Sequence, residues 1–399
     1  MFDSLKFYDF KMNAGIVQTS FFKRFSSPPE ITLRAPGRIN LIGEHTDYNG
    51  GFVLPAAIDK AIWFAAGRRK DGRFAFYALD LDAFFLSEDE HPVFQEKYSW
   101  ANYLLGVVSE ARKDGLDFGG LNVVFGGDVP LGAGLSSSAA LESGAMFILN
   151  ELYDLGLSKM DIVRLAQRGE NNFVGMKCGI MDMFASVMGR ENAFVRLDCR
   201  SLEFEYFPFD TRDYSLVLCD SRVKHALVDS EYNTRRSECE EGVSVLKRYD
   251  PAISSLRDVR LDFLKKHQND LREVVFKRCK YVVEEIGRVE KACAALQKND
   301  LKTVGALMFE THDGLNLEYQ VSVPELNFMV EIARTDRAVL GSRMMGGGFG
   351  GCTINLVKTK AAGEFITVLR EAYRRVFHLE MAAYPVRLTD GIQILHEET

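Results

Sequence analysis

The chain has 399 residues, of which 47% are hydrophobic and 26% are charged, and its formal net charge is −7. These values are ordinary for a soluble globular protein, and a chain of this length buries enough apolar surface to fold without disulfide or metal crosslinks. The mild acidity argues against a protein that coats nucleic acid, because such a protein is usually basic. The length predicts between two and three domains.

Seven cysteines are scattered along the chain without a C-x-x-C pair, and the histidines form no H-E-x-x-H motif. This pattern argues against a disulfide framework and a zinc site, and free thiols are typical of a reducing compartment. No apolar run approaches the length of a membrane span, and the N-terminus lacks the apolar core of a signal peptide. We therefore expect a cytoplasmic protein with no membrane and no nucleic-acid partner.

The first half of the chain alternates extended and helical patterns. Runs rich in apolar and β-branched residues predict strands at residues 31–33, 62–69, 121–125, 194–197 and 214–219. Apolar residues at helical spacing predict helices at 137–153 and 161–174.

The second half begins with a charged helical region at 256–307, which carries an apolar stripe. A glycine cluster at 346–351 then leads into a predicted strand at 352–357. No proline-rich or serine-rich linker separates the halves. We therefore expect two tightly packed α+β halves with a boundary near residue 210.

A loop typical of phosphate binding lies between the strand at 121–125 and the helix at 137–153. It contains Gly132 and Gly134, followed by the serines 136–138. Glycines let the backbone approach a ligand closely, and unpaired N–H groups at a helix start bind anions. The lysine of a P-loop is absent, as are the D-F-G and H-R-D motifs of protein kinases. The alternative interpretation is an ordinary capped helix after a glycine turn.

An earlier segment, residues 35–51, places Arg38, Glu44, His45 and Asp47 within ten residues. Carboxylates and an imidazole on a turn can hold a polyhydroxy ligand, because each carboxylate accepts hydrogen bonds from two hydroxyls. Taken by itself, a charged segment of this kind between glycine turns is more often a solvated charged turn.

A literal G-x-G-x-x-G occurs at Gly346, Gly348 and Gly351. A predicted strand follows it, whereas a dinucleotide-binding loop opens a helix. The order of the elements therefore argues against a dinucleotide site.

Together, these segments resemble the galactokinases, within the superfamily of homoserine, mevalonate and phosphomevalonate kinases. The similar stretches are the sugar signature at 35–51, the phosphate loop at 130–142, the third motif at 343–352, and residues 178–182 and 225–240. The resemblance implies an α+β fold of two domains with the active site in the cleft. The N-terminal domain, 1–210, would be like ribosomal protein S5, and the C-terminal domain, 211–399, would be ferredoxin-like.

The resemblance also implies an activity. The protein would be an ATP-dependent sugar kinase that phosphorylates the anomeric hydroxyl of α-D-galactose with Mg-ATP, giving galactose 1-phosphate and ADP. Magnesium would be the cofactor, galactose and ATP the small-molecule partners, and the protein would be a monomer. A kinase for another sugar, such as N-acetylgalactosamine, and a non-catalytic regulator that binds galactose and ATP remain alternatives. The complete serine loop and the presence of Asp182 favour an enzyme.

The resemblance assigns roles to individual residues. Asp182 would be the catalytic base, with Arg38 beside it. The sugar would be held by Glu44, His45, Asp47, Gly179 and Tyr232. The nucleotide phosphates would be bound by Gly132, Gly134, Ser136, Ser137 and Ser138, and the adenine by Trp100 and Tyr103. Ser138 and Glu170 would hold Mg²⁺.

Three positions depart from the family pattern. Met183, Gly314 and Met345 stand where glutamine, serine and threonine are usual. The first departure replaces a polar group with a thioether next to the expected base.

Overall fold

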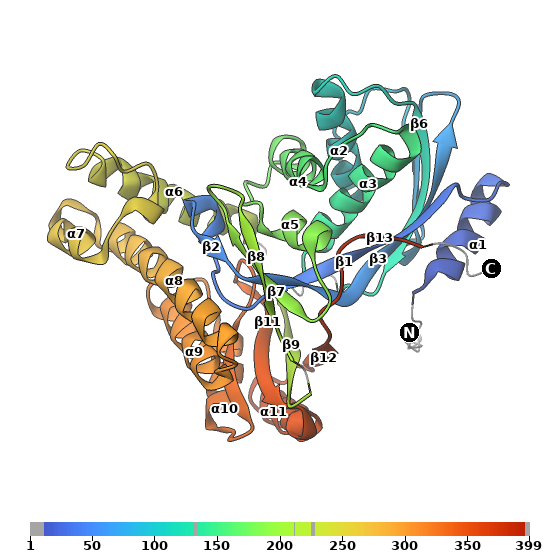
Figure 1. Ribbon diagram of the computed structural model, residues 1–399. Coiled ribbons are helices and arrows are strands. Elements are labelled where there is room, and N and C mark those ends of the chain that lie inside the picture. The colour runs from blue at the N-terminus through green and yellow to red at the C-terminus, as the bar shows by residue number, and fades with distance from the viewer. Residues whose placement is uncertain (1–11, 131–133, 211, 225–227, 396–399) are drawn as a thin grey trace.

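A computed structural model describes residues 12–130, 134–210, 212–224 and 228–395. The first half is built on a six-stranded sheet with the order β13-β1-β3-β6-β4-β5. Its strands are β1 (Ile31–Asn40), β3 (Pro55–Arg69), β4 (Phe74–Ala78), β5 (Ala83–Leu86), β6 (Gly120–Gly127) and β13 (Gln393–Ile394). Because β13 pairs with β1, the end of the chain returns to the N-terminal sheet (Figure 1).

Helices cover both faces of this sheet. Successive side chains of β3 point to opposite faces: Phe64 packs beside Gly144, whereas Ala65 packs with Val17 and Phe21. The helices of this half are α1 (Ala14–Phe25), α2 (Asn102–Lys113), α3 (Ser137–Tyr153), α4 (Lys159–Arg168) and α5 (Met181–Met188). Thus α3 lies against one face and α1 against the other (Figure 1).

A small antiparallel sheet, β2-β7-β8, extends the first half toward the second. Its strands are β2 (Phe52–Val53), β7 (Ala193–Asp198) and β8 (Phe204–Pro208). The boundary expected near residue 210 falls between β8 and the next strand along the chain, and it stays a prediction.

The second half is built on an antiparallel sheet with the order β10-β11-β9-β12. Its strands are β9 (Tyr214–Lys224), β10 (Val339–Met344), β11 (Gly350–Lys358) and β12 (Ala382–Val386). Its helices are α6 (Val228–Leu246), α7 (Leu261–Lys266), α8 (Glu273–Gln297), α9 (Leu301–Leu317), α10 (Pro324–Thr335) and α11 (Ala362–Phe377). Helices separate β9 from β10, and α11 separates β11 from β12. This succession and strand order are those of a ferredoxin-like domain, as expected.

The predicted elements are largely confirmed, although several of their bounds differ. The strand expected at 31–33 continues to Asn40, because the first residues of the sugar signature are buried inside the sheet. The helix expected at 161–174 is interrupted: α4 ends at Arg168, and a π-helical turn (Gly169–Val174) follows it.

The two halves share one core. A continuous hydrophobic cluster includes residues from Ile31 in β1 to Ile392 near the end of the chain. Tight packing of the halves is therefore confirmed. Within the described residues, none of the helices combines the length and apolar character needed to cross a bilayer.

Candidate active site

A cavity of about 360 Å³ lies between the two halves, lined by the sugar signature, the start of α3, the segment before α5, α6 and the glycine cluster. It brings together twelve of the predicted site residues: Arg38, Glu44, His45, Asp47, Gly134, Ser136, Ser137, Ser138, Glu170, Gly179, Asp182 and Tyr232. Gly132 lies outside the described residues. Trp100 and Tyr103 do not belong to the lining.

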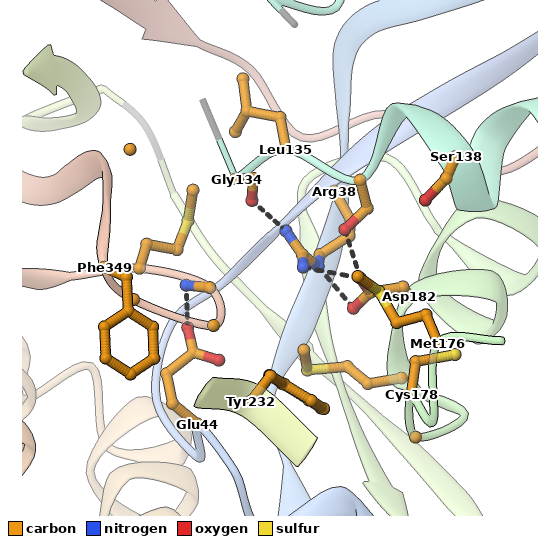
Figure 2. A pocket seen from close by; sticks show the side chains of 18 of the residues that line it. Arg38, Glu44, Gly134, Leu135, Ser138, Met176, Cys178, Asp182, Tyr232 and Phe349 are labelled. Carbon is orange, nitrogen blue, oxygen red and sulfur yellow. Dashed lines mark hydrogen bonds and ion pairs between the residues drawn. The ribbon is translucent and has the colours of Figure 1, made fainter. Parts of the chain in front are cut away.

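Arg38 and Asp182 form an ion pair at the centre of the cavity (Figure 2). Arg38 Nε donates to Asp182 Oδ1 at 2.8 Å, and Nη2 donates to Oδ2 at 2.7 Å. The arginine is 4% exposed and comes from β1, whereas Asp182 lies in the first turn of α5. This two-pronged geometry fixes the carboxylate, and the positive end of the helix dipole also favours its negative charge.

The residues before α3 form hydrogen bonds with this ion pair. Arg38 Nη1 donates to the Gly134 carbonyl at 2.5 Å, and the Ser136 hydroxyl donates to Asp182 Oδ2. Ser136 has a φ of +55°, so its backbone turns left-handed immediately before the helix. The unpaired N–H groups of the first turn of α3 therefore face the same cavity as the carboxylate.

Glu44 is anchored by the second half of the molecule. Its Oε1 accepts hydrogen bonds from Arg343 Nη1 at 3.0 Å and from the Gly346 N–H at 2.8 Å. The Glu44 side chain is 2% exposed, and Arg343 is fully buried. The sugar signature is thus packed inside the protein, and its interpretation as a solvated charged turn is wrong.

Asp47 lies next to Gly179 at the edge of the cavity. A Cβ atom on Gly179 would overlap the Asp47 carboxylate, so the close approach of these two residues requires glycine. Removal from water raises the pKa of Asp47 to about 7, and the negative charge of Asp182 adds to the shift.

His45 is also enclosed. Its ring is 4% exposed and lies 5.4 Å from the ring of Tyr232, which comes from α6. Burial lowers the pKa of His45 to about 3, so the imidazole is neutral at physiological pH. Tyr232 in turn packs beside Gly347 of the glycine cluster.

A group of buried carboxylates surrounds Ser138. Glu170, in the π-helical turn, accepts a hydrogen bond from Cys178 Sγ at 3.1 Å. Burial raises the pKa of Glu170 to about 7, and a hydrogen bond from Ser138 opposes the shift. Glu142 of α3 is fully buried, and neither of its carboxylate oxygens has a partner among the described residues. Carboxylate and hydroxyl oxygens gathered in this way, two of them without a hydrogen-bond partner among the described residues, are ligands that a hard divalent cation prefers.

The remaining predicted positions have other surroundings. Trp100 packs on Phe125 with ring centroids 5.8 Å apart, and Tyr103 packs against the same core. Met183 is fully buried in the hydrophobic core. Gly314 lies against the ring of Tyr281, where a Cβ atom would approach to 2.7 Å. Of the three departures from the family pattern, Met345 alone lines the cavity.

Three features were missed from the sequence. Arg343 lies in the third motif, and this position is the only sign in the sequence that it belongs to the site. Nothing in the motif indicates a contact with Glu44. The hydroxyl of Ser136 reaches Asp182 instead of facing only the phosphates. The buried acid Glu142 ends the phosphate-loop segment but receives no role from the sequence pattern, although a glutamate among apolar neighbours early in a helix is a weak signal for a special role.

Models of known protein families match three parts of this chain. The GHMP kinases N terminal domain matches residues 102–190, and the GHMP kinases C terminal domain matches residues 292–375. With the cavity between the halves, these matches define a GHMP kinase. The galactokinase galactose-binding signature matches residues 19–68. The chain belongs to the galactokinase family, whose members are ATP-dependent sugar kinases.

Similar proteins extend over nearly the whole chain. The galactokinase of Roseiflexus sp. (strain RS-1) is 40% identical and aligns with 96% of this chain and 97% of its own length. The galactokinase of Clostridium acetobutylicum is 38% identical over 94% of this chain and 98% of its own.

Among solved structures, the galactokinase of Lactococcus lactis complexed with galactose is 31% identical, with a TM-score of 0.91 over 96% of this chain and 99% of its own. The mevalonate kinase of Methanococcus jannaschii shares the fold, with a TM-score of 0.64 and 16% identity over 90% of this chain and 98% of its own.

Proposed function

We propose that this protein transfers the γ-phosphoryl group of ATP to the anomeric hydroxyl of α-D-galactose, giving galactose 1-phosphate and ADP. The observation that carries the proposal is a single cavity that joins the sugar signature, the Arg38–Asp182 pair and the start of α3. The similarity to a galactokinase complexed with galactose supports galactose as the sugar.

The sugar would bind between the signature and α6, held by Glu44, His45, Asp47, Gly179 and Tyr232. Both hydrogen bonds that the Glu44 carboxylate accepts from the described residues reach Oε1. This arrangement leaves Oε2 to accept a hydrogen bond from a sugar hydroxyl. A buried site built in this way rejects a sugar that lacks the matching hydroxyl, because the carboxylate would then lose its partner.

The nucleotide would bind along the start of α3. The phosphates would be held by Gly132, Gly134, Ser136, Ser137 and Ser138, through backbone N–H groups and hydroxyls. Trp100 and Tyr103 would line the adenine site, which would extend beyond the lining of this cavity. Helix-start N–H groups would here replace the lysine of a P-loop.

Magnesium fits the pocket of oxygen atoms beside Ser138, and Ser138 and Glu170 are the residues that would hold it. Among the described residues, no group of three or more His, Cys, Asp and Glu side chains could hold a metal ion. A site with few protein ligands suits Mg²⁺, which keeps waters and shares substrate phosphates. When bound, Mg²⁺ supplies neutralisation of the phosphate charge.

Asp182 would accept the proton of the anomeric hydroxyl as that oxygen attacks phosphorus. The two hydrogen bonds from Arg38 fix the direction of the carboxylate. Arg38 is also close enough to the start of α3 to donate toward the transferring phosphoryl group. Phosphoryl transfer depends mainly on alignment and charge neutralisation, and this constellation provides both.

The proposal includes a cytoplasmic monomer. All seven cysteines are free thiols, which supports a reducing compartment. Twelve of the predicted site residues line one cavity within a single chain, which supports a site that one copy can form.

The test is ADP release with Mg-ATP over a panel of galactose, N-acetylgalactosamine, arabinose and glucose, with the product of the best sugar examined by ³¹P NMR. We expect galactose to give the highest rate and a phosphate ester at C1. Faster turnover of another sugar would contradict the substrate. Galactose binding without ADP release, measured by calorimetry, would identify a regulator instead.

A further inference from the structure

A chain of hydroxyl groups connects His45 to the second half of the molecule. His45 Nδ1 lies 2.7 Å from the hydroxyl of Tyr48, which lies 2.8 Å from the hydroxyl of Tyr319. The Tyr319 hydroxyl lies 3.3 Å from Cys239 Sγ on α6. Tyr48 belongs to the sugar signature, whereas Tyr319 follows α9, so the chain crosses between the halves.

The conformation of His45 is tightly constrained. Its backbone has a φ of +63°, a region that non-glycine residues rarely adopt and that costs free energy. The Tyr319 ring lies 4.7 Å from the imidazole, and the His45 carbonyl accepts a hydrogen bond from Asn49 at 2.8 Å. The protein therefore holds this ring in one orientation.

A neutral imidazole carries one donor nitrogen and one acceptor nitrogen. His45 Nε2 is buried at the cavity and has no hydrogen-bond partner among the described residues. A phenol hydroxyl is a stronger hydrogen-bond donor than an imidazole N–H, and an imidazole nitrogen is a stronger acceptor than a phenol oxygen, so the hydrogen bond of 2.7 Å runs from the Tyr48 hydroxyl to Nδ1. The hydrogen therefore belongs on Nε2, and Nδ1 accepts from Tyr48.

The direction of the remaining hydrogen bonds follows from this choice. The Tyr48 hydroxyl donates to His45, so its oxygen accepts from Tyr319. The Tyr319 oxygen in turn accepts from the Cys239 thiol. Each hydroxyl in the chain then has one donor and one acceptor role filled.

We propose that Tyr48 and Tyr319 are positioning residues that fix the hydrogen of His45 on Nε2, so that the imidazole donates to a hydroxyl oxygen of the bound sugar. This inference rests on the proposed function for the identity of the sugar. Through Tyr319, the second half of the molecule takes part in sugar recognition without touching the sugar.

The test replaces only the hydroxyl groups, with Tyr48→Phe and Tyr319→Phe. The matched control is Tyr373→Phe: this tyrosine of α11 is fully buried, as Tyr319 is, and its hydroxyl donates to the Ser221 carbonyl at 2.9 Å. ¹⁵N-histidine labelling, with His45 assigned by a His45→Gln variant, shows by NMR which imidazole nitrogen carries the hydrogen.

In the wild type we expect a protonated Nε2 and an acceptor Nδ1. Tyr48→Phe should give a mixture of tautomers and weaken sugar binding about tenfold, the loss of one hydrogen bond, with kcat changed less than threefold. Tyr319→Phe should cause a smaller change of the same kind. The double variant should bind sugar no more weakly than Tyr48→Phe alone, because both act through one imidazole. Tyr373→Phe should change neither the tautomer nor the affinity.

A protonated Nδ1 in the wild type, or an unchanged tautomer in Tyr48→Phe, would overturn the proposal. If the two tyrosines have only a structural role, both variants will have a lower melting temperature but the tautomer and sugar affinity of the wild type. That result would also overturn the proposal. The tautomer is measured without substrate. If the galactokinase assignment is wrong, the ADP-release assay over the panel of sugars will show it. The tautomer of His45 can still be determined in that case.

Discussion

Arg343 and Glu44 form a buried ion pair across the two halves of the molecule, with Nη1 and Oε1 separated by 3.0 Å. Arg343 also donates from Nε to the carbonyl of Leu41 at 2.9 Å. One arginine of the third motif therefore holds both the carboxylate and the backbone of the sugar signature. The shape of the sugar site depends on the second half of the chain.

Arg343→Met should lower the free energy of unfolding by about 3–5 kcal/mol, because it leaves the Glu44 carboxylate buried without its counter-ion. Denaturant unfolding measures the loss. The double variant Arg343→Met/Glu44→Leu removes both charges and should be less destabilised than the sum of the two single variants. Additive losses would show that the two residues do not act as a pair.

Gly179→Ala should raise the KM for galactose at least tenfold, on the order expected from losing a hydrogen bond to a carboxylate, because the new methyl group displaces Asp47. Gly179 does not have a positive φ, so alanine fits its backbone and the fold should persist. The control is Gly287→Ala in α8, where the methyl group meets no atom within 4 Å. That control should keep full activity and be slightly more stable. An unchanged KM in Gly179→Ala would separate Asp47 from sugar binding.

Asp47 should make the stability of the free protein depend on pH. Its pKa is about 7 in the folded protein, above its ordinary value, so the folded state binds the proton more tightly than the unfolded state. The wild type should therefore lose stability relative to Asp47→Asn as the pH rises from about 4 to about 7. Each unit of pKa difference corresponds to about 1.4 kcal/mol, which sets an upper bound of about 4 kcal/mol.

Comparing the two proteins at each pH removes the contributions of the other titrating groups. His45 and His312, each with a pKa lowered to about 3 by burial, act in the opposite direction. A constant difference in unfolding free energy between wild type and variant across this pH range would contradict the shift at Asp47.

Local patterns in the sequence predict the elements better than the contacts. The bounds of α3 and the position of the glycine cluster follow from periodicity and turn residues alone. The burial of Arg38 and Glu44 does not, because charged residues near glycines more often lie in solvent. Their partners lie in α5 and β10, far along the chain, and only the fold brings them together. The family resemblance supplied the Arg38–Asp182 pairing, but not the anchoring of Glu44.

Asp182→Asn should lower kcat by about 10²–10⁴, the usual contribution of a general base. Asparagine has nearly the same size but cannot take the proton, and it keeps one oxygen for Arg38. Galactose affinity by calorimetry should change little, and the melting temperature should remain close to that of the wild type. A folded, galactose-binding variant that keeps a tenth or more of the turnover would remove Asp182 as the base and leave alignment by Arg38 as the main contribution.

The ratio of kcat/KM for galactose to that for glucose tests the central claim most directly, because the two sugars differ in the direction of one hydroxyl group. Glu44 and Asp47 lie in the galactokinase signature and line the cavity, where a misplaced hydroxyl leaves a carboxylate without its partner. We predict a ratio of at least about a hundred, measured by ADP release with Mg-ATP. Equal values for the two sugars would contradict selectivity for galactose while leaving the chain a GHMP kinase.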